Sequence, residues 1–90
     1  RMISVPNSAP LEVLSFVRQN ERDKVFAVLN FSAQRQRVAF QERLYCGKYV
    51  DYFAERPVEL GESFRLTLEP WDYRVFVKSA ADQAARSQVP

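Results

Sequence analysis

Hydrophobic and polar residues alternate with a period of two in several short stretches of the chain, as expected for strands that bury one face. The clearest stretches are residues 11–18, 37–41, 63–68 and 71–78. Shorter β-prone stretches lie at 49–53, which is aromatic, and at 58–60. No stretch keeps the 3.6-residue period of an amphipathic helix. The pattern therefore predicts strands throughout.

The alternation also predicts which side chains share a face. In the first stretch Leu14 and Phe16 lie on one face, and in the second Val38 and Phe40 do so. The side chains of Arg65 and Thr67 are expected to point outward. The inward positions expected in the last two strands are Phe64, Leu66, Leu68, Tyr73, Val75 and Val77.

Residues 24–31 differ from the other strands because they are apolar on both faces. From Val25 the stretch reads Val-Phe-Ala-Val-Leu-Asn-Phe. A strand with hydrophobic residues on both faces is typically buried from both sides. We therefore expect a central strand that is covered on two sides.

The strands are separated by polar or Gly- and Pro-containing turns about every 8 to 12 residues, which is typical of a sandwich or barrel. The predicted fold is an all-β antiparallel sandwich of about six to eight short strands. The length of 90 residues suits one domain. We expect the domain to span residues 1–79. Residues 80–90 are rich in Ala, Gln, Asp and Arg, have little to bury, and are predicted to form a flexible tail.

Composition narrows the possible functions. Thirteen basic and eleven acidic residues give a net charge of +2, and the two signs are interspersed, so no basic face for nucleic acid is expected. No apolar run approaches the roughly 18 residues that cross a bilayer, so no membrane partner is expected. The first residues lack the apolar core of a signal peptide, so none is predicted there.

The residue types needed for most catalytic and metal sites are scarce. The chain has no His and one Cys, Cys46, which excludes an internal disulfide, His-assisted nucleophiles and the usual zinc sites. With only Gly47 and Gly61 there is no phosphate-binding loop. The carboxylates lie mostly at turns or outward positions. We predict no catalytic residue, metal or cofactor, and the lone thiol favours a reducing, cytoplasmic location.

Aromatic residues are the most distinctive chemical feature. Exposed Tyr and Trp rings stack on the apolar faces of sugars, which makes Trp71, Tyr73 and Tyr52 candidates for carbohydrate binding. For Trp71 and Tyr73 we favour a place in the core or in an interface, because Trp is highly buried on average and the alternation points Tyr73 inward. The aromatic residues that cluster in the second half include Tyr45, Tyr49, Tyr52, Phe53, Trp71 and Tyr73.

The tripeptide Asn30-Phe31-Ser32 fits the acceptor sequence for N-glycosylation. It also lies where a strand ends, a position at which Asn and Ser side chains often bond to nearby backbone groups. We favour this local structural interpretation, since nothing else in the sequence indicates secretion.

Several sequence blocks occur together and in a particular order. Leu14 to Arg18 is a hydrophobic strand that ends in Arg, and after a charged turn Val25 to Ser32 ends in Asn-Phe-Ser. Gly47 to Phe53 has the form G-x-Y-x-D-x-F, and Leu66 to Phe76 contains Pro-Trp-Asp-Tyr. Over residues 11–78 the chain resembles the C-terminal β-sandwich domain of the α-amylase superfamily, glycoside hydrolase family thirteen.

This resemblance implies a role beside an enzyme rather than catalysis. The catalytic carboxylates of the family lie in a (β/α)₈ barrel, which needs roughly 250 residues, so none carries over to this chain. The sandwich would pack on the barrel of an α-amylase- or α-glucosidase-like enzyme that acts on α-glucans, and stabilise it. Two alternatives are a glucan-binding module that uses surface aromatics and an unrelated immunoglobulin-like interaction domain.

Overall fold

The computed structural model describes residues 2–79, which form eight strands and no helix. The predicted all-β fold is confirmed. The tail predicted for residues 80–90 lies outside the described residues. In the described part no helix could span a membrane. The strands are β1 (Met2–Ser4), β2 (Val13–Gln19), β3 (Asp23–Asn30), β4 (Gln36–Gln41), β5 (Gly47–Asp51), β6 (Arg56–Leu60), β7 (Ser63–Leu68) and β8 (Tyr73–Ser79).

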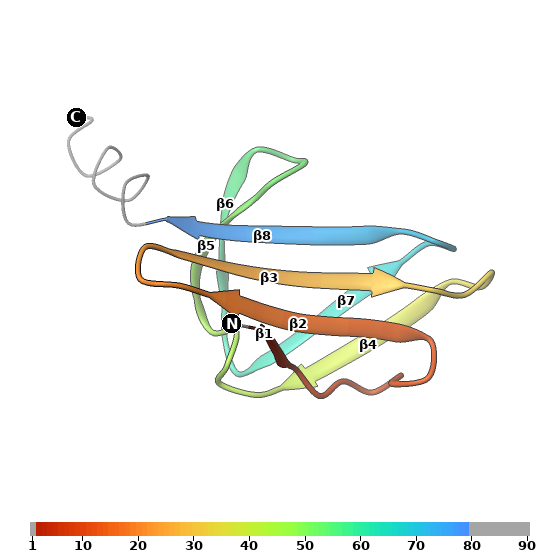
Figure 1. Ribbon diagram of the computed structural model, residues 1–90. Helices are drawn as coiled ribbons and strands as arrows, with labels where there is room; N and C mark the ends of the chain where they lie inside the picture. Colours follow the sequence, from red (N-terminus) through yellow and green to blue (C-terminus); the bar gives the residue numbers. More distant parts are fainter. Residues whose placement is uncertain (1, 80–90) are drawn as a thin grey trace.

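The strands form two antiparallel sheets that pack as two layers. The larger sheet has six strands in the order β1-β2-β3-β8-β5-β6, and the smaller pairs β4 with β7. Figure 1 shows the long strands β2, β3 and β8 side by side, with β4 and β7 crossing them at an angle. The expected central strand, 24–31, is β3, which lies between β2 and β8.

The core fills the space between the two sheets and is built around aromatic rings. The ring of Phe26 stacks on Tyr45 with centroids 4.9 Å apart and meets Phe40 edge-on at 5.5 Å. Such pairs contribute about 0.5–1.5 kcal/mol beyond their buried area. Other buried side chains of this core are Val13, Val17, Val28, Val38, Tyr49, Leu60, Leu68 and Phe76.

The predicted faces are correct where only one face of a strand is apolar. Val38 and Phe40 of β4 are both buried. In β7 the alternation holds, with Arg65 and Thr67 exposed and Leu68 buried. Phe64 and Leu66 pack against the core from the same side.

In β8 the predicted inward face is wrong. Phe76 is the buried residue and stands directly opposite Phe26, whose ring it stacks on at 5.9 Å. Successive residues of a strand point to opposite faces. Tyr73, Val75 and Val77 therefore lie on the outer face of the six-stranded sheet, and Tyr73 is 50% exposed. Both faces of β8 carry apolar residues, so alternation alone does not distinguish them.

In β2 Leu14 and Phe16 share a face as predicted, but it is the outer one. A serine is tolerated on the inner face because the Ser15 hydroxyl donates to the Val5 carbonyl and accepts from the Asn7 amide, both at 2.7 Å. The hydrogen bonds offset the cost of burying a polar group. The residues of β2 that face the core are Val13, Ser15 and Val17.

Candidate interaction face

The outer face of the six-stranded sheet is apolar across four neighbouring strands. In antiparallel pairs, residues directly opposite each other point to the same side of the sheet. The second sheet packs on the inner side, so in residues 2–79 no element covers this outer face. The interaction face consists of three cross-strand rows, Leu14–Leu29–Tyr73, Phe16–Ala27–Val75, and Val25–Val77–Val50.

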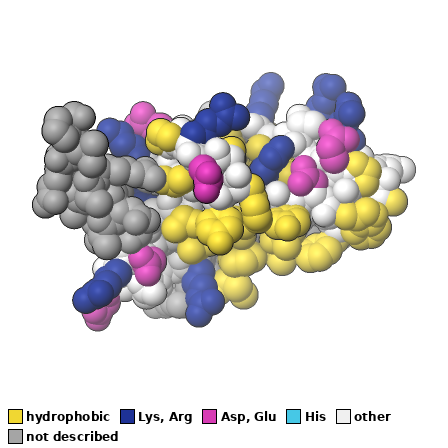
Figure 2. Space-filling view, turned by 90° about the horizontal axis from the view of Figure 1, so that it is seen from above, with side chains coloured by type: hydrophobic (Ala, Val, Ile, Leu, Met, Phe, Trp, Pro, Cys, Tyr) yellow, Lys and Arg dark blue, Asp and Glu magenta, His cyan; other side chains and the backbone are white. Residues whose placement is uncertain are grey.

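The apolar character of this face is specific to one side of the molecule. An antiparallel sheet that covers a core usually turns a polar face to water, and the small sheet does so with Arg37, Ala39, Arg65 and Thr67. Figure 2 shows hydrophobic side chains gathered in a continuous band, with charged side chains mainly along another side. The two-sided cover expected of β3 is present on its inner side only, within residues 2–79.

A ridge of exposed aromatic rings continues the interaction face beyond β8. Phe53 meets Tyr52 edge-on at 5.2 Å and Tyr73 edge-on at 5.1 Å. Tyr52 is 64% exposed. Two sequence candidates, Tyr52 and Tyr73, are thus linked through Phe53. Sequence reasoning did not select Phe53, although it belongs to the same aromatic stretch.

A shallow groove of about 280 Å³ runs beside this aromatic ridge. Aromatic faces and charged hydrogen-bonding groups meet there, a combination that suits recognition of a polar ring such as a sugar. The residues that line the groove are Asp51, Phe53, Ala54, Asp72, Tyr73 and Arg74.

The third candidate, Trp71, is 62% exposed, so of the two places expected for it, core or interface, the core is wrong and the interface stays a prediction. It occupies a tight turn in which the Asp72 N–H donates to the Glu69 carbonyl at 3.0 Å, with Pro70 as the second residue. The φ angle of Trp71 is +60°. This is the position of a type II turn that normally takes Gly or Asn, and a larger residue there costs about 1–3 kcal/mol.

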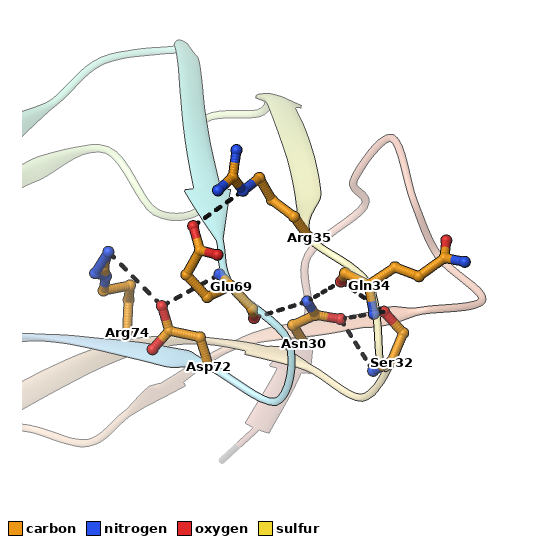
Figure 3. Close-up of polar contacts among 7 residues, drawn as sticks. All are labelled: Asn30, Ser32, Gln34, Arg35, Glu69, Asp72 and Arg74. Carbon is orange, nitrogen blue, oxygen red and sulfur yellow. Dashed lines mark hydrogen bonds and ion pairs between the residues drawn. The ribbon is translucent and has the colours of Figure 1, made fainter.

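A hydrogen-bond network holds this turn against the end of β3 (Figure 3). The amide nitrogen of Asn30 donates to the carbonyls of Gln34 at 2.8 Å and Glu69 at 3.0 Å. Its oxygen accepts from the backbone and hydroxyl of Ser32. The Trp71 N–H in turn donates to the Ser32 carbonyl at 3.2 Å. Asn30 is buried and uses both amide hydrogens, which confirms the structural interpretation of Asn-Phe-Ser.

Comparison with protein families identifies the family to which the chain belongs. The family model described as the C-terminal domain of maltogenic amylase matches residues 3–75, most of the chain. The chain belongs to this family. A comparison with curated protein sequences gave no match. The resemblance of the sequence blocks to an amylase-type C-terminal domain is confirmed, and it takes the place of the immunoglobulin-like alternative.

Within residues 2–79, the groups with displaced pKa values lie away from the interaction face. Burial raises the pKa of Tyr49 to about 12, and its hydroxyl has no hydrogen-bond partner among the described residues. Burial also raises the pKa of Tyr45. Burial and then the charge of Lys78 lower the pKa of Lys24. Within residues 2–79 no cluster of His, Cys, Asp or Glu suits a metal ion.

Proposed function

We propose that this domain is a non-catalytic accessory part of an amylase-type glycoside hydrolase that acts on α-glucans. In this proposal the interaction face packs on the catalytic barrel of the same protein and stabilises it. The observation that supports it is the apolar outer face of the six-stranded sheet. Contiguous exposed apolar surface of this kind marks a place where another protein surface docks.

The backbone of the Trp71 turn supports the same proposal. Trp71 has a φ of +60°, which carries a conformational cost, while its side chain is 62% exposed and makes no aromatic ring contact within residues 2–79. Strained, exposed positions of this kind are common at binding surfaces. Trp71 and Tyr73 then belong to the interface, in line with the preference stated from the sequence for a core or interface position.

The test compares the catalytic barrel alone with the joined protein. We expect the joined protein to melt at a higher temperature, and Leu14→Lys, which puts a charge on the interaction face, to remove most of that gain. Thr67→Lys makes a similar change on the polar face of the small sheet and should leave the gain intact. Equal melting of barrel and joined protein contradicts the proposal, as does a gene product with no (β/α)₈ domain before Arg1.

A second candidate function is glucan binding at the aromatic ridge. It is favoured by the exposed rings of Tyr52 and Tyr73 and by the adjoining groove with its carboxylates and Arg74. Trp71 makes no ring contact with this ridge among the described residues, so its contribution would be a separate one. Rings stack on the sugar while the charged groups bond to its hydroxyls.

Titration calorimetry with maltoheptaose tests this second function. Tyr52→Ala and Tyr73→Ala should each weaken binding. Phe31→Ala, which removes an exposed aromatic ring outside the ridge, should not. A titration without heat rules the function out. Binding by the free domain that is lost in the joined protein would show that the barrel covers the ridge.

The cytoplasmic location expected from the sequence also remains part of the proposal. Cys46 is half-buried and its thiol donates to the Glu42 carbonyl at 3.3 Å. A free thiol is more readily kept in a reducing compartment. Fractionation of cells that express the whole protein tests this, and recovery outside the cytoplasm would contradict it.

A further inference from the structure

Strand β7 has one edge that is free within residues 2–79, because it pairs only with β4. The direction of its backbone groups follows from Ala39 of β4, which stands opposite Arg65. The Ala39 N–H donates to the Ser8 hydroxyl and its carbonyl accepts from the Ser8 N–H, so both groups point away from β7. In such a pair both partners direct their backbone groups outward. The N–H and C=O of Arg65 therefore face the free edge.

An open cleft of about 560 Å³ lies beside this edge, between β7 and strands β6 and β8. Its volume is in the range of ligand-binding sites. The two-stranded sheet of β4 and β7 is narrower than the six-stranded sheet on which it packs. The cleft lies beside β7, where the smaller sheet ends. The apolar side chains that line it are Val58, Leu60, Phe64, Leu66 and Phe76.

The charged side chains on the rim of the cleft balance in number, so they do not distinguish an acidic occupant from a basic one. The rim carries two acidic and two basic side chains, Asp51, Glu59, Arg56 and Arg74. The Nε of Arg74 is buried and has no hydrogen-bond partner among the described residues. The Nη2 of the same guanidinium lies 3.8 Å from a carboxylate oxygen of Asp72, so this arginine is already paired with an acidic group.

Two further arginines lie on the outer side of the small sheet. Arg65 of β7 and Arg37 of β4 are diagonal neighbours, since Arg37 stands opposite Thr67 and Arg65 opposite Ala39. Neither side chain makes an ion pair with any residue of the described part. They leave a positive surface next to the free edge.

We propose that the free edge of β7 accepts an extended acidic peptide segment of a partner protein as a third strand of the small sheet. Main-chain hydrogen bonds to Arg65 would hold the segment, as in other cases of strand addition. Alternate side chains of an added strand point to opposite faces. Apolar ones enter the cleft, and carboxylates between them face Arg65 and Arg37. This surface is separate from the interaction face of the six-stranded sheet.

The experiment titrates the 90-residue chain with a blocked octapeptide of alternating valine and glutamate, followed by fluorescence anisotropy. A peptide of alternating valine and lysine is the control and should bind at least about tenfold more weakly. Arg65→Pro removes the N–H at the free edge and spares the ladder with β4, a place where proline is tolerated. It should weaken binding about tenfold, the equivalent of one hydrogen bond. Arg65→Ala keeps the N–H and should weaken binding less.

Amide hydrogen exchange in the unmodified chain provides a measurement that needs no variant. Saturating valine–glutamate peptide should slow exchange of the Arg65 amide at least about tenfold, because it becomes hydrogen-bonded. No saturable binding, unchanged Arg65 exchange, or equal binding by Arg65→Pro would overturn the proposal. A dimer of the free chain that Arg65→Pro converts to a monomer would also overturn it, since the edge would then pair with a second copy.

Discussion

The side-chain amide of Asn30 donates to the backbone carbonyl of Glu69 at 3.0 Å, across 39 residues of sequence. This bond joins the end of β3 to the turn that presents Trp71 (Figure 3). Two of the sequence blocks that resemble the amylase-type domain therefore meet in a single hydrogen-bond network. Their residue types are explained by local architecture.

Replacing Asn30 tests the importance of that network. Asn30→Ala should lower the free energy of unfolding by about 2–4 kcal/mol, because two carbonyls lose their donor in a buried place. Asn20 accepts from two backbone N–H groups in an exposed turn, so Asn20→Ala should cost less than about 1 kcal/mol. Urea denaturation measures both values. Equal losses of unfolding free energy would show that the Asn30 hydrogen-bond network contributes no more than an exposed turn does.

Replacing Trp71, the residue with positive φ in the turn, distinguishes an effect on the stability of the domain from an effect on its docking. Trp71→Gly should stabilise the isolated chain by about 1 kcal/mol, because glycine adopts φ +60° without strain. In the protein joined to its catalytic domain the same change should weaken docking and lower the melting temperature. Glu55 has φ +56°, so Glu55→Gly should stabilise both forms. A joined protein that gains stability from Trp71→Gly would remove Trp71 from the interface.

The pKa of Tyr49 predicts a loss of stability at alkaline pH. Its pKa is about 12 in the fold, against 10.0 ordinarily, so the folded state holds this proton more tightly than the unfolded chain does. The stabilisation is complete below pH 10 and is lost as the pH rises toward about 12.

Substitution of this tyrosine should flatten that dependence. Tyr49→Phe should make the free energy of unfolding fall less steeply above pH 10, with a remaining fall from Tyr45, whose pKa is also raised. Near neutral pH the change should be neutral or stabilising, since it removes an unpartnered buried hydroxyl. Tyr52→Phe, which removes the hydroxyl of an exposed ring, is the matched control. Denaturation across the pH range gives the comparison, and identical curves for wild type and Tyr49→Phe would refute it.

Two lysines stand directly opposite each other on β3 and β8, Lys24 and Lys78. Like charges in this arrangement are destabilising, and opposite charges contribute about 0.2–1 kcal/mol. Lys24→Glu should therefore stabilise the fold by about 0.5–1 kcal/mol near neutral pH, and Lys24→Gln by less. The pKa of Lys24 is lowered first by burial and then by the charge of Lys78, so both effects destabilise the fold while this lysine is charged and cease to do so as the pH rises toward 10.5. The gain should shrink in high salt. Thermal unfolding at two salt concentrations tests this, and a destabilised Lys24→Glu would contradict it.

Residues of β4 and β7 show how far alternation predicts structure. Val38, Phe40 and Leu68 are buried as expected because each strand has only one apolar face. In β8 and β2 both faces carry large apolar groups. Which face turns to the core therefore depends on the elements that pack on each side of the sheet. Phe76 enters the core because Phe26 stands opposite it. The short strand β1 shows too few residues for any pattern.

In the candidate site too, some features were predicted from the sequence and others are known only from the structure. The sequence marked Tyr52, Tyr73 and Trp71 by residue type, and all three are exposed. That Phe53 joins two of them, and that Trp71 stands apart, depends on β5 leaving β8 and on the turn geometry at φ +60°. The contact between Phe53 and Tyr73 joins segments that are distant in sequence, which no local pattern encodes.

By itself, then, the amino-acid sequence determined an all-β domain of the amylase-type C-terminal family. Because residues 24–31 are apolar on both faces, the sequence also predicted that β3 would be buried from both sides. Only the tertiary structure shows which face of β3 is buried by the domain's own second sheet. Strands β4 and β7 pack on one side of the six-stranded sheet, so within residues 2–79 the face of Leu14, Leu29 and Tyr73 has no cover.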